Sequence, residues 1–184
     1  LISDGASTPQ WFNLFTANST YSGNLTFSGT ITSTGANSFT GKQTFAGTSS
    51  NVATVLTNAA EKVTVSATAA TGTINYDVTT QSVLYYTTAA SANWTMNFRA
   101  SSGTTLNAAL GVGESITVVF MATNGATAYY NNAITIDGTS VTPKYQGGVA
   151  WSYGTATGID AYTYTIIKTA SATYTVLASQ IRFA

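Results

Sequence analysis

Carboxylates, hydroxyls and aromatic rings are the groups in this sequence whose chemistry must be weighed, because it contains no cysteine and no histidine. The missing thiol excludes thiolate catalysis, and the missing imidazole removes the commonest general base and metal ligand. A serine hydrolase would need a Ser-Lys arrangement, and none of the lysines lies in such a motif. The carboxylates are scattered, without the clustering of a calcium site or an acid-base pair. They are Asp4, Glu61, Asp77, Glu114, Asp137 and Asp160. We therefore expect no enzyme, no cofactor and no bound metal.

Two aromatic clusters place flat rings beside hydroxyl and amide side chains, a composition typical of sugar-binding surfaces. The first spans residues 129–132 and the second residues 151–153, and both lie next to predicted turns. In a β-sandwich such rings also serve as core residues or as part of an oligomer interface. The candidate contacts for a host-surface receptor or glycan are Tyr129, Tyr130, Trp151 and Tyr153.

The chain is poor in charge. Charged residues make up 7% of its 184 residues, and six basic residues balance six acidic ones; an average soluble domain has roughly 25% charged residues. This balance gives no field that would attract nucleic acid or an anionic membrane. The longest apolar stretch, residues 116–122, is far shorter than the roughly 20 residues that span a bilayer. We therefore expect neither nucleic-acid binding nor membrane insertion.

A six-residue repeat runs from Phe15 to Ser50 in six consecutive units. Its third position is glycine in five units, and its sixth position is always Thr or Ser. Its first position holds Phe15, Tyr21, Phe27, Ser33, Phe39 and Phe45. A Thr/Ser/Gly-rich segment can also be a flexible linker. A linker would not keep aromatic residues in one register throughout, so the repeat predicts ordered structure.

The length of the repeat indicates how it is built. Six is a multiple of the strand period of two and not of 3.6, so the aromatic and glycine positions share one face of an extended chain. The glycines indicate either turns with positive φ or close backbone approach. A solitary β-helix uses about three hexads per coil, so this repeat would form only about two coils, fewer than a stable solenoid needs. Three chains wound together would cover one another's aromatic faces. The repeat therefore predicts a homotrimeric shaft whose core contains Phe15, Tyr21, Phe27, Phe39 and Phe45.

Residues 62–184 alternate between apolar and polar side chains in about eight to ten short segments, of which Ile74, Tyr76 and Val78 are one example. This pattern, without helical spacers, predicts an antiparallel β-sandwich or jelly roll. One helical turn is expected at residues 105–110. The segments are separated by turn dipeptides: Thr71-Gly72, Ser102-Gly103, Asn124-Gly125, Asp137-Gly138 and Gly147-Gly148.

The predicted organisation is all-β and has four parts. These are an N-terminal joint at residues 1–14, the shaft at 15–50, a connector at 51–61 and the β-sandwich head at 62–184. Within the connector, residues 52–59 have the apolar spacing of a short helix, whereas their β-branched content equally allows a strand. Residue 1 is leucine, so we take the chain as the C-terminal portion of a longer polypeptide, with processing as the alternative.

Several segments resemble proteins of tailed-phage particles. The Phe-Ser-Gly and Phe-Thr-Gly units of the repeat resemble the stems of phage fibres, and residues 1–12 resemble a joint that precedes such shafts. Residues 81–99, 114–125, 134–145 and 162–184 resemble a C-terminal domain of fibre and other virion proteins from cyanophage-like viruses. The resemblance implies a virion component and transfers no individual functional residue.

The expected function is a structural component of a virus particle, located on the virion surface as a trimeric tail fibre or spike segment. Its head would either touch the host surface, with a host glycan as a candidate ligand, or cap the fibre, and its N-terminal end would join other virion proteins. One alternative is a decoration fibre on the capsid shell. An alternative of another class is a secreted bacterial adhesin or a carbohydrate-binding module, which would share the Thr-rich β composition.

Overall fold

The computed structural model describes residue 36 and residues 38–50 and 52–184. It divides into two compact units, Leu1–Val55 and Leu56–Ala184. The predicted joint and the shaft positions Phe15, Tyr21 and Phe27 lie outside the described residues.

The described part of the hexad repeat contains neither helix nor strand. Its aromatic side chains are open to solvent in the single chain, with Phe39 73% and Phe45 66% exposed. Gly41 has a φ of +84°, which is the turn conformation considered for the repeat glycines. The described residues of the connector, 52–61, also form neither the helix nor the strand that their sequence allowed.

The regular secondary structure of the second unit is almost entirely β-strand, which confirms the predicted all-β class. Ten strands lie within its residues, together with one helical turn, α1 (Leu106–Ala109), and a short 3-10 turn, η1 (Gln146–Gly148). The strands are β1 (Val63–Ala69), β2 (Gly72–Asp77), β3 (Val83–Thr88), β4 (Trp94–Arg99), β5 (Ser115–Thr123), β6 (Asn131–Ile136), β7 (Thr139–Ser140), β8 (Lys144–Tyr145), β9 (Ile159–Ala170) and β10 (Thr173–Phe183).

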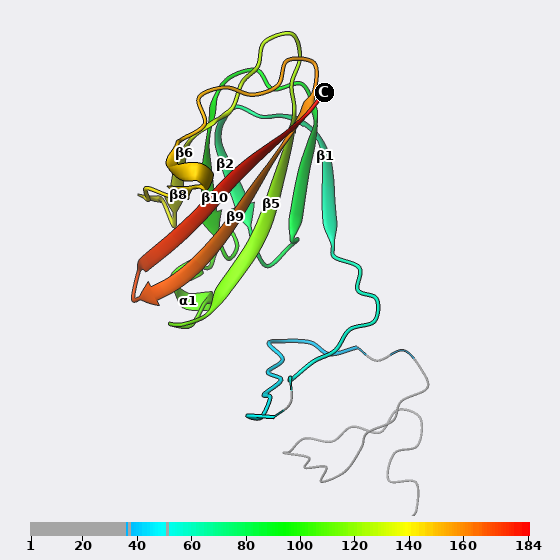
Figure 1. The fold of residues 1–184 in the computed structure, drawn as a ribbon, viewed down its shortest axis with the longest axis vertical. Helices are drawn as coiled ribbons and strands as arrows, with labels where there is room; N and C mark the ends of the chain where they lie inside the picture. Colours follow the sequence, from blue (N-terminus) through cyan, green and yellow to red (C-terminus); the bar gives the residue numbers. More distant parts are fainter. Residues whose placement is uncertain (1–35, 37, 51) are drawn as a thin grey trace, which may run out of the picture. The chain divides into compact units, whose positions relative to one another are not determined.

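The strands form two sheets, and the chain winds between them. Sheet A has the order β1-β3-β5-β9-β10-β8, and sheet B has the order β2-β4-β6-β7. Each of the strands β1 to β5 is followed along the chain by a strand of the other sheet. Figure 1 shows the two layers, with β5, β9 and β10 crossing in front of sheet B. Among β1 to β6, neighbours within a sheet are therefore separated in sequence by one strand of the opposite sheet.

This winding makes the prediction of an antiparallel sandwich wrong. The β1–β3, β3–β5, β2–β4, β4–β6 and β8–β10 pairs are parallel, and the β5–β9, β9–β10 and β6–β7 pairs are antiparallel. The reason is that Thr71-Gly72 and Asn124-Gly125 join strands of different sheets instead of closing hairpins. Among the predicted turns, Asp137-Gly138 closes a two-residue hairpin between β6 and β7, with φ of 51° and 81°.

Between the sheets lies a core rich in aromatic rings. Trp94 makes edge-on contacts with Phe120 and Tyr162, at centroid distances of 5.7 and 5.6 Å. Phe98 contacts Tyr164 at 4.9 Å. All five side chains are at most 1% exposed. These rings come from β4 in one sheet and β5 and β9 in the other, so the two layers are held together by one continuous aromatic contact surface.

The predicted helical turn is confirmed as α1, in the connection between β4 and β5. Two charged side chains from distant parts of the chain bind its ends. The carboxylate of Asp137 accepts hydrogen bonds from the backbone N–H groups of Leu106 and Asn107, at 2.7 and 3.0 Å. The Nζ of Lys168, a residue only 7% exposed, donates to the carbonyl oxygens of Asn107 and Leu110, at 2.6 and 2.8 Å. Each charge satisfies backbone groups that a short helix leaves unpaired.

Polar side chains on the outer face of sheet B form a ladder across the parallel strands. Asn75 in β2, Asn97 in β4 and Thr135 in β6 are register partners. Asn97 donates to the Oδ1 of Asn75 at 2.8 Å, and its own Oδ1 accepts from the Thr135 hydroxyl at 2.8 Å and from the Gly138 N–H at 2.9 Å. Asn97 therefore connects β2, β4 and the β6–β7 turn.

We predict that Asn97→Ala lowers the free energy of unfolding by about 2 kcal/mol, because it leaves three polar partners without the central amide. Asn75→Ala is the matched control: it removes one hydrogen bond at an exposed side chain and should cost less than about 1 kcal/mol. Urea unfolding of both variants measures the two losses. Equal losses would show that the ladder does not depend on its central member.

Candidate functional site

The four candidate aromatic residues lie on two loops that contact each other. Tyr129 and Tyr130 belong to the loop between β5 and β6, and Trp151 and Tyr153 to the loop between η1 and β9. The Thr157 N–H donates to the Gly125 carbonyl at 2.7 Å, and the Asn124 N–H donates to the Gly158 carbonyl at 2.9 Å. Figure 1 shows both loops at the end of the domain near the C-terminus.

A buried carboxylate holds these two loops together. Asp160, the first inward-facing residue of β9, is 0% exposed. It accepts hydrogen bonds from the Thr155 N–H at 3.0 Å and from the Asn124 side-chain amide at 3.0 Å. The same amide donates to the Tyr129 carbonyl at 3.1 Å. Gly154 completes the arrangement, because a Cβ at this position would clash with the Tyr129 carbonyl oxygen and with Asp160.

Burial is the main influence on the pKa values of Asp160 and Tyr162 in this network. Loss of hydration raises the pKa of Asp160, and the hydrogen bonds from Thr155 partly oppose that shift. Burial likewise raises the pKa of Tyr162, whose hydroxyl accepts from the side-chain amide of Gln180 at 3.1 Å, and the nearby charge of Asp160 adds to the effect. A carboxylate with a shifted pKa would be a candidate catalytic acid or base if it lined an open cleft. Here the carboxylate is covered and engaged by the loops, which fits a structural brace.

The structure separates the roles of Trp151 and Tyr153. The ring of Trp151 packs edge-on against Tyr145, Tyr162 and Tyr164, at centroid distances of 4.8, 5.2 and 6.4 Å. Its indole N–H donates to the Asn131 carbonyl. Trp151 is therefore an extension of the aromatic core, and its removal would disturb packing.

Tyr153 has a different environment, with 56% of its surface exposed. The guanidinium carbon of Arg182 lies 4.3 Å from the centroid of its ring, and Gln180 donates to its carbonyl oxygen at 3.0 Å. A cation over one ring face leaves a flat, amphipathic surface suited to stacking against a sugar or a peptide. Tyr129 and Tyr130 are half-buried and pack against the core.

Sequence reasoning missed Asn124, Asp160 and Arg182 as residues that organise these loops. The alternation of β9 contained a signal for Asp160, because it shares the inward positions with Tyr162 and Tyr164. Arg182 carried no such signal, since its contact with Tyr153 depends on the pairing of β9 with β10 and on the path of the preceding loop.

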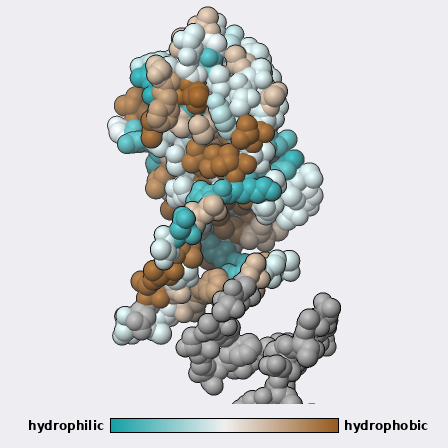
Figure 2. All heavy atoms as spheres, turned by 90° about the vertical axis from the view of Figure 1, so that its right-hand side faces the viewer, coloured by the Kyte–Doolittle hydropathy of each residue, from teal (hydrophilic) through white to brown (hydrophobic). Residues whose placement is uncertain are grey.

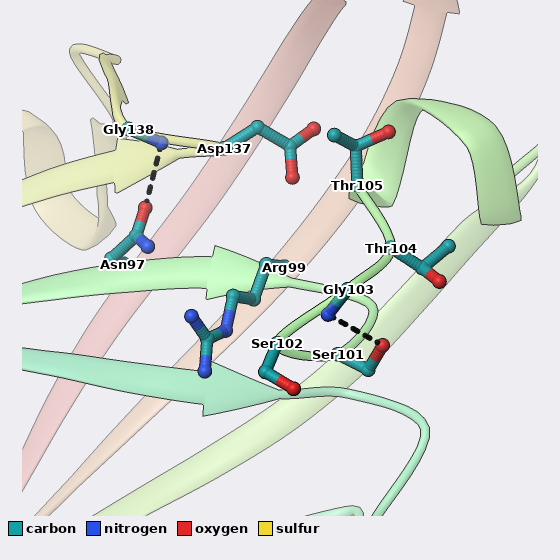
Figure 3. Close-up of a pocket in the computed structure, with 9 residues that line it drawn as sticks. All are labelled: Asn97, Arg99, Ser101, Ser102, Gly103, Thr104, Thr105, Asp137 and Gly138. Carbon is teal, nitrogen blue, oxygen red and sulfur yellow. Dashed lines mark hydrogen bonds between the residues drawn. The ribbon is translucent and has the colours of Figure 1, made fainter.

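A polar pocket of about 410 Å³ lies at the C-terminal end of β4, beside the β6–β7 turn of sheet B. Asn97 and Arg99 of β4, the segment 101–105 and the Asp137-Gly138 turn surround it, as Figure 3 shows. Both charged groups are already engaged: Asp137 binds the N-terminus of α1, and Arg99 Nε lies 2.5 Å from Asp77 Oδ1. Hydrogen bonding to Asp77 raises the pKa of Arg99. The pocket therefore offers hydroxyl and amide groups and no free nucleophile with a base.

Residues 36, 38–50 and 52–184 contain no group of three or more acidic, histidine or cysteine side chains placed to hold a metal ion. No helix within the same residues is long and apolar enough to cross a membrane.

Comparison with known proteins returned no match: neither a protein-family model, nor a curated protein, nor a solved structure is similar to the chain.

We predict that Asp160→Asn changes how stability depends on pH. Burial raises the folded-state pKa of this carboxyl above its ordinary value of 3.8, so the folded protein retains the proton to higher pH than the unfolded chain. The contribution of Asp160 to the free energy of unfolding is therefore greatest below about pH 3.8 and declines as pH rises through the folded-state pKa. The asparagine variant lacks this titration.

Unfolding of both proteins in urea between about pH 3 and pH 7 measures the effect. The unfolding free energy of the wild type minus that of the variant should decrease as pH increases. A difference that stays constant or grows with pH would contradict the raised pKa.

Proposed function

We propose that the chain is a non-enzymatic structural component of a virus particle, a segment of a trimeric tail fibre or spike. The observation that carries this proposal is the six-unit repeat between Phe15 and Ser50, whose aromatic positions keep one register. A repeated aromatic face is stable in water when other side chains bury it, and three identical chains related by symmetry can bury one another's faces.

The described end of the repeat supports the need for partner chains. Phe39 and Phe45 are 73% and 66% exposed in the single chain. Complete burial of such a side chain stabilises a structure by about 1.5–3 kcal/mol. Two phenylalanines in each of three chains would therefore contribute a large share of the assembly energy, provided that the chains cover them mutually.

The segments that resemble virion domains contain most of the strands of the second unit. The four resembling segments contain β3 and β4, β5, most of the β6–β8 region, and nearly all of β9 and β10. These elements include Trp94, Phe98, Phe120, Tyr162 and Tyr164, which form the aromatic core. The segments behind the resemblance thus include residues of the buried core as well as of the surface.

An adhesive role at the loop end is favoured by one observation, the exposed Tyr153 ring beneath Arg182. This surface could bind a host glycan in a fibre, and it would serve equally in an adhesin or a carbohydrate-binding module. The polar, uncharged character of the surrounding loops suits a neutral saccharide, which is recognised by stacking and hydrogen bonds.

We predict that Tyr153→Ala weakens binding to a glycan array at least about tenfold, the loss expected from about 1.4 kcal/mol of stacking energy. Val149→Ala is the matched control, because Val149 is a 77% exposed apolar residue of the same loop. Trp151→Ala is unsuitable as a test because that ring belongs to the core. Unchanged binding by Tyr153→Ala would remove the glycan contact from the proposal.

We predict that wild-type protein has a molar mass near three times 19.0 kDa, about 57 kDa, at micromolar concentration. The double variant Phe39→Ser/Phe45→Ser should dissociate at a concentration at least about tenfold higher, because the shaft loses apolar area in every chain. Light scattering over a dilution series measures both properties.

The control is Val55→Ser/Leu56→Ser, which removes two side chains that are 81% and 70% exposed and lie outside the repeat. Its dissociation should match that of the wild type. A wild-type monomer, or equal effects of the two double variants, would contradict the trimeric shaft.

A further inference from the structure

The outer face of sheet A, defined as the outward side chains of β1, β3, β5, β9 and β10, contains no charged residue. The register pairs Val65, Tyr85, Met121, Ala161 and Ile181 into one row across the five strands. A second row places Thr163 beside Val119. Charge appears at the margin of this face, where Lys144 of β8 is the register partner of Leu177. An uncharged centre with a charged margin is the composition of a protein interface.

The alternation of β1 points to the same face. Its apolar residues, Val63 and Val65, are 47% and 63% exposed, whereas Thr64 and Ser66 occupy the alternate, less exposed positions. A strand that served only the core of its own domain would show the opposite order. On β10, Leu177, Ile181 and Phe183 are likewise 46%, 52% and 53% exposed. Figure 2, which looks at the side where β1 lies, shows apolar patches among side chains of nearly neutral hydropathy, with hydrophilic side chains beside them.

We infer that the outer face of sheet A is the contact between the head domains of neighbouring copies of this chain. This inference rests on the proposed trimer and adds to it a second interface, separate from the shaft. A second copy fits the chemistry of the face, because two uncharged surfaces can meet without burying an unpaired charge. A nucleic acid or a strongly charged protein would find no opposite charges on this face.

The area of the outer face of sheet A suits an interface that forms only when the head domains are already linked through another part of the chain. Five strands at about 4.8 Å spacing, each with about seven residues at about 3.3 Å, cover on the order of 550 Å². A standard interface buries about 800 Å² on each partner, so this face alone would associate weakly. Residues 51–62 span at most about 40 Å when extended. A trimeric shaft would therefore hold the three heads at an effective concentration in the millimolar range, which favours a weak interface.

The absence of cysteine from the sequence makes a clean test possible. Thr163→Cys places one thiol at the centre of the outer face of sheet A, and Thr95→Cys places one on the outer face of sheet B. Both threonines are half-buried and point outward, so their intrinsic accessibility is matched. Maleimide labelling of the full chain is measured at micromolar concentration, with the rate in urea as the reference for each variant, and light scattering gives the molar mass of the same samples.

We expect a trimeric mass and a labelling rate at least about tenfold slower for Thr163→Cys than for Thr95→Cys. Dilution to the monomer should abolish the difference. A trimeric mass with equal rates overturns this inference and leaves the proposed trimer standing. A monomeric mass overturns both, and a difference that persists in the monomer overturns the contact between copies.

As a second readout, Thr163→Lys should lower the melting temperature of the trimer more than Thr95→Lys, because it buries an unpaired charge between copies. Equal melting temperatures overturn the inference even if a cysteine variant fails to fold.

Discussion

The structure depends on one constraint: the chain must pass from one sheet to the other after each of its first five strands. Among β1 to β6, strands that follow one another along the chain therefore do not pair, and each pairs with the next strand but one: β1 with β3, β3 with β5, β2 with β4 and β4 with β6. Because successive strands of one sheet run in the same direction, equivalent residues stack in rows. Ile74, Met96 and Ile134 form one such row, and all three are at most 4% exposed. The Asn97 ladder follows from the same stacking of register partners.

The few charges of the domain are mostly used inside it. Asp77 pairs with Arg99 across parallel strands, Asp137 and Lys168 bind the two ends of α1, and Asp160 braces the loops. Consequently, wide areas of surface are left to hydroxyl and aliphatic side chains. Such surfaces suit permanent contacts between copies and the recognition of neutral ligands better than they suit steering of a charged partner.

Much of this fold could be predicted from local patterns. The two-residue alternation predicted the strands, because the side of a strand that faces the core is a local property. The helical turn at 105–110 and the Asp137-Gly138 hairpin were also correct. Strand direction was not predictable, since Thr71-Gly72 has the same turn chemistry whether the chain reverses within a sheet or crosses to the other one.

The candidate site was predictable to a lesser extent. Loop composition made Tyr153 a candidate contact, and the exposure of its ring agrees with a surface position. The same composition could not distinguish Trp151, whose ring turns inward because Tyr145, Tyr162 and Tyr164 offer it an aromatic pocket. Contacts between distant segments decided its role, and these depend on the winding of the whole chain.

The winding is tested most directly by nuclear Overhauser contacts between side chains of β2 and β4. Parallel pairing in the observed register predicts contacts of Ile74 with Met96 and of Tyr76 with Phe98, whose ring centroids are 5.6 Å apart. Antiparallel pairing about the same centre would exchange the partners, bringing Ile74 to Phe98 and Tyr76 to Met96. Observation of the exchanged pair in place of the first would contradict the account.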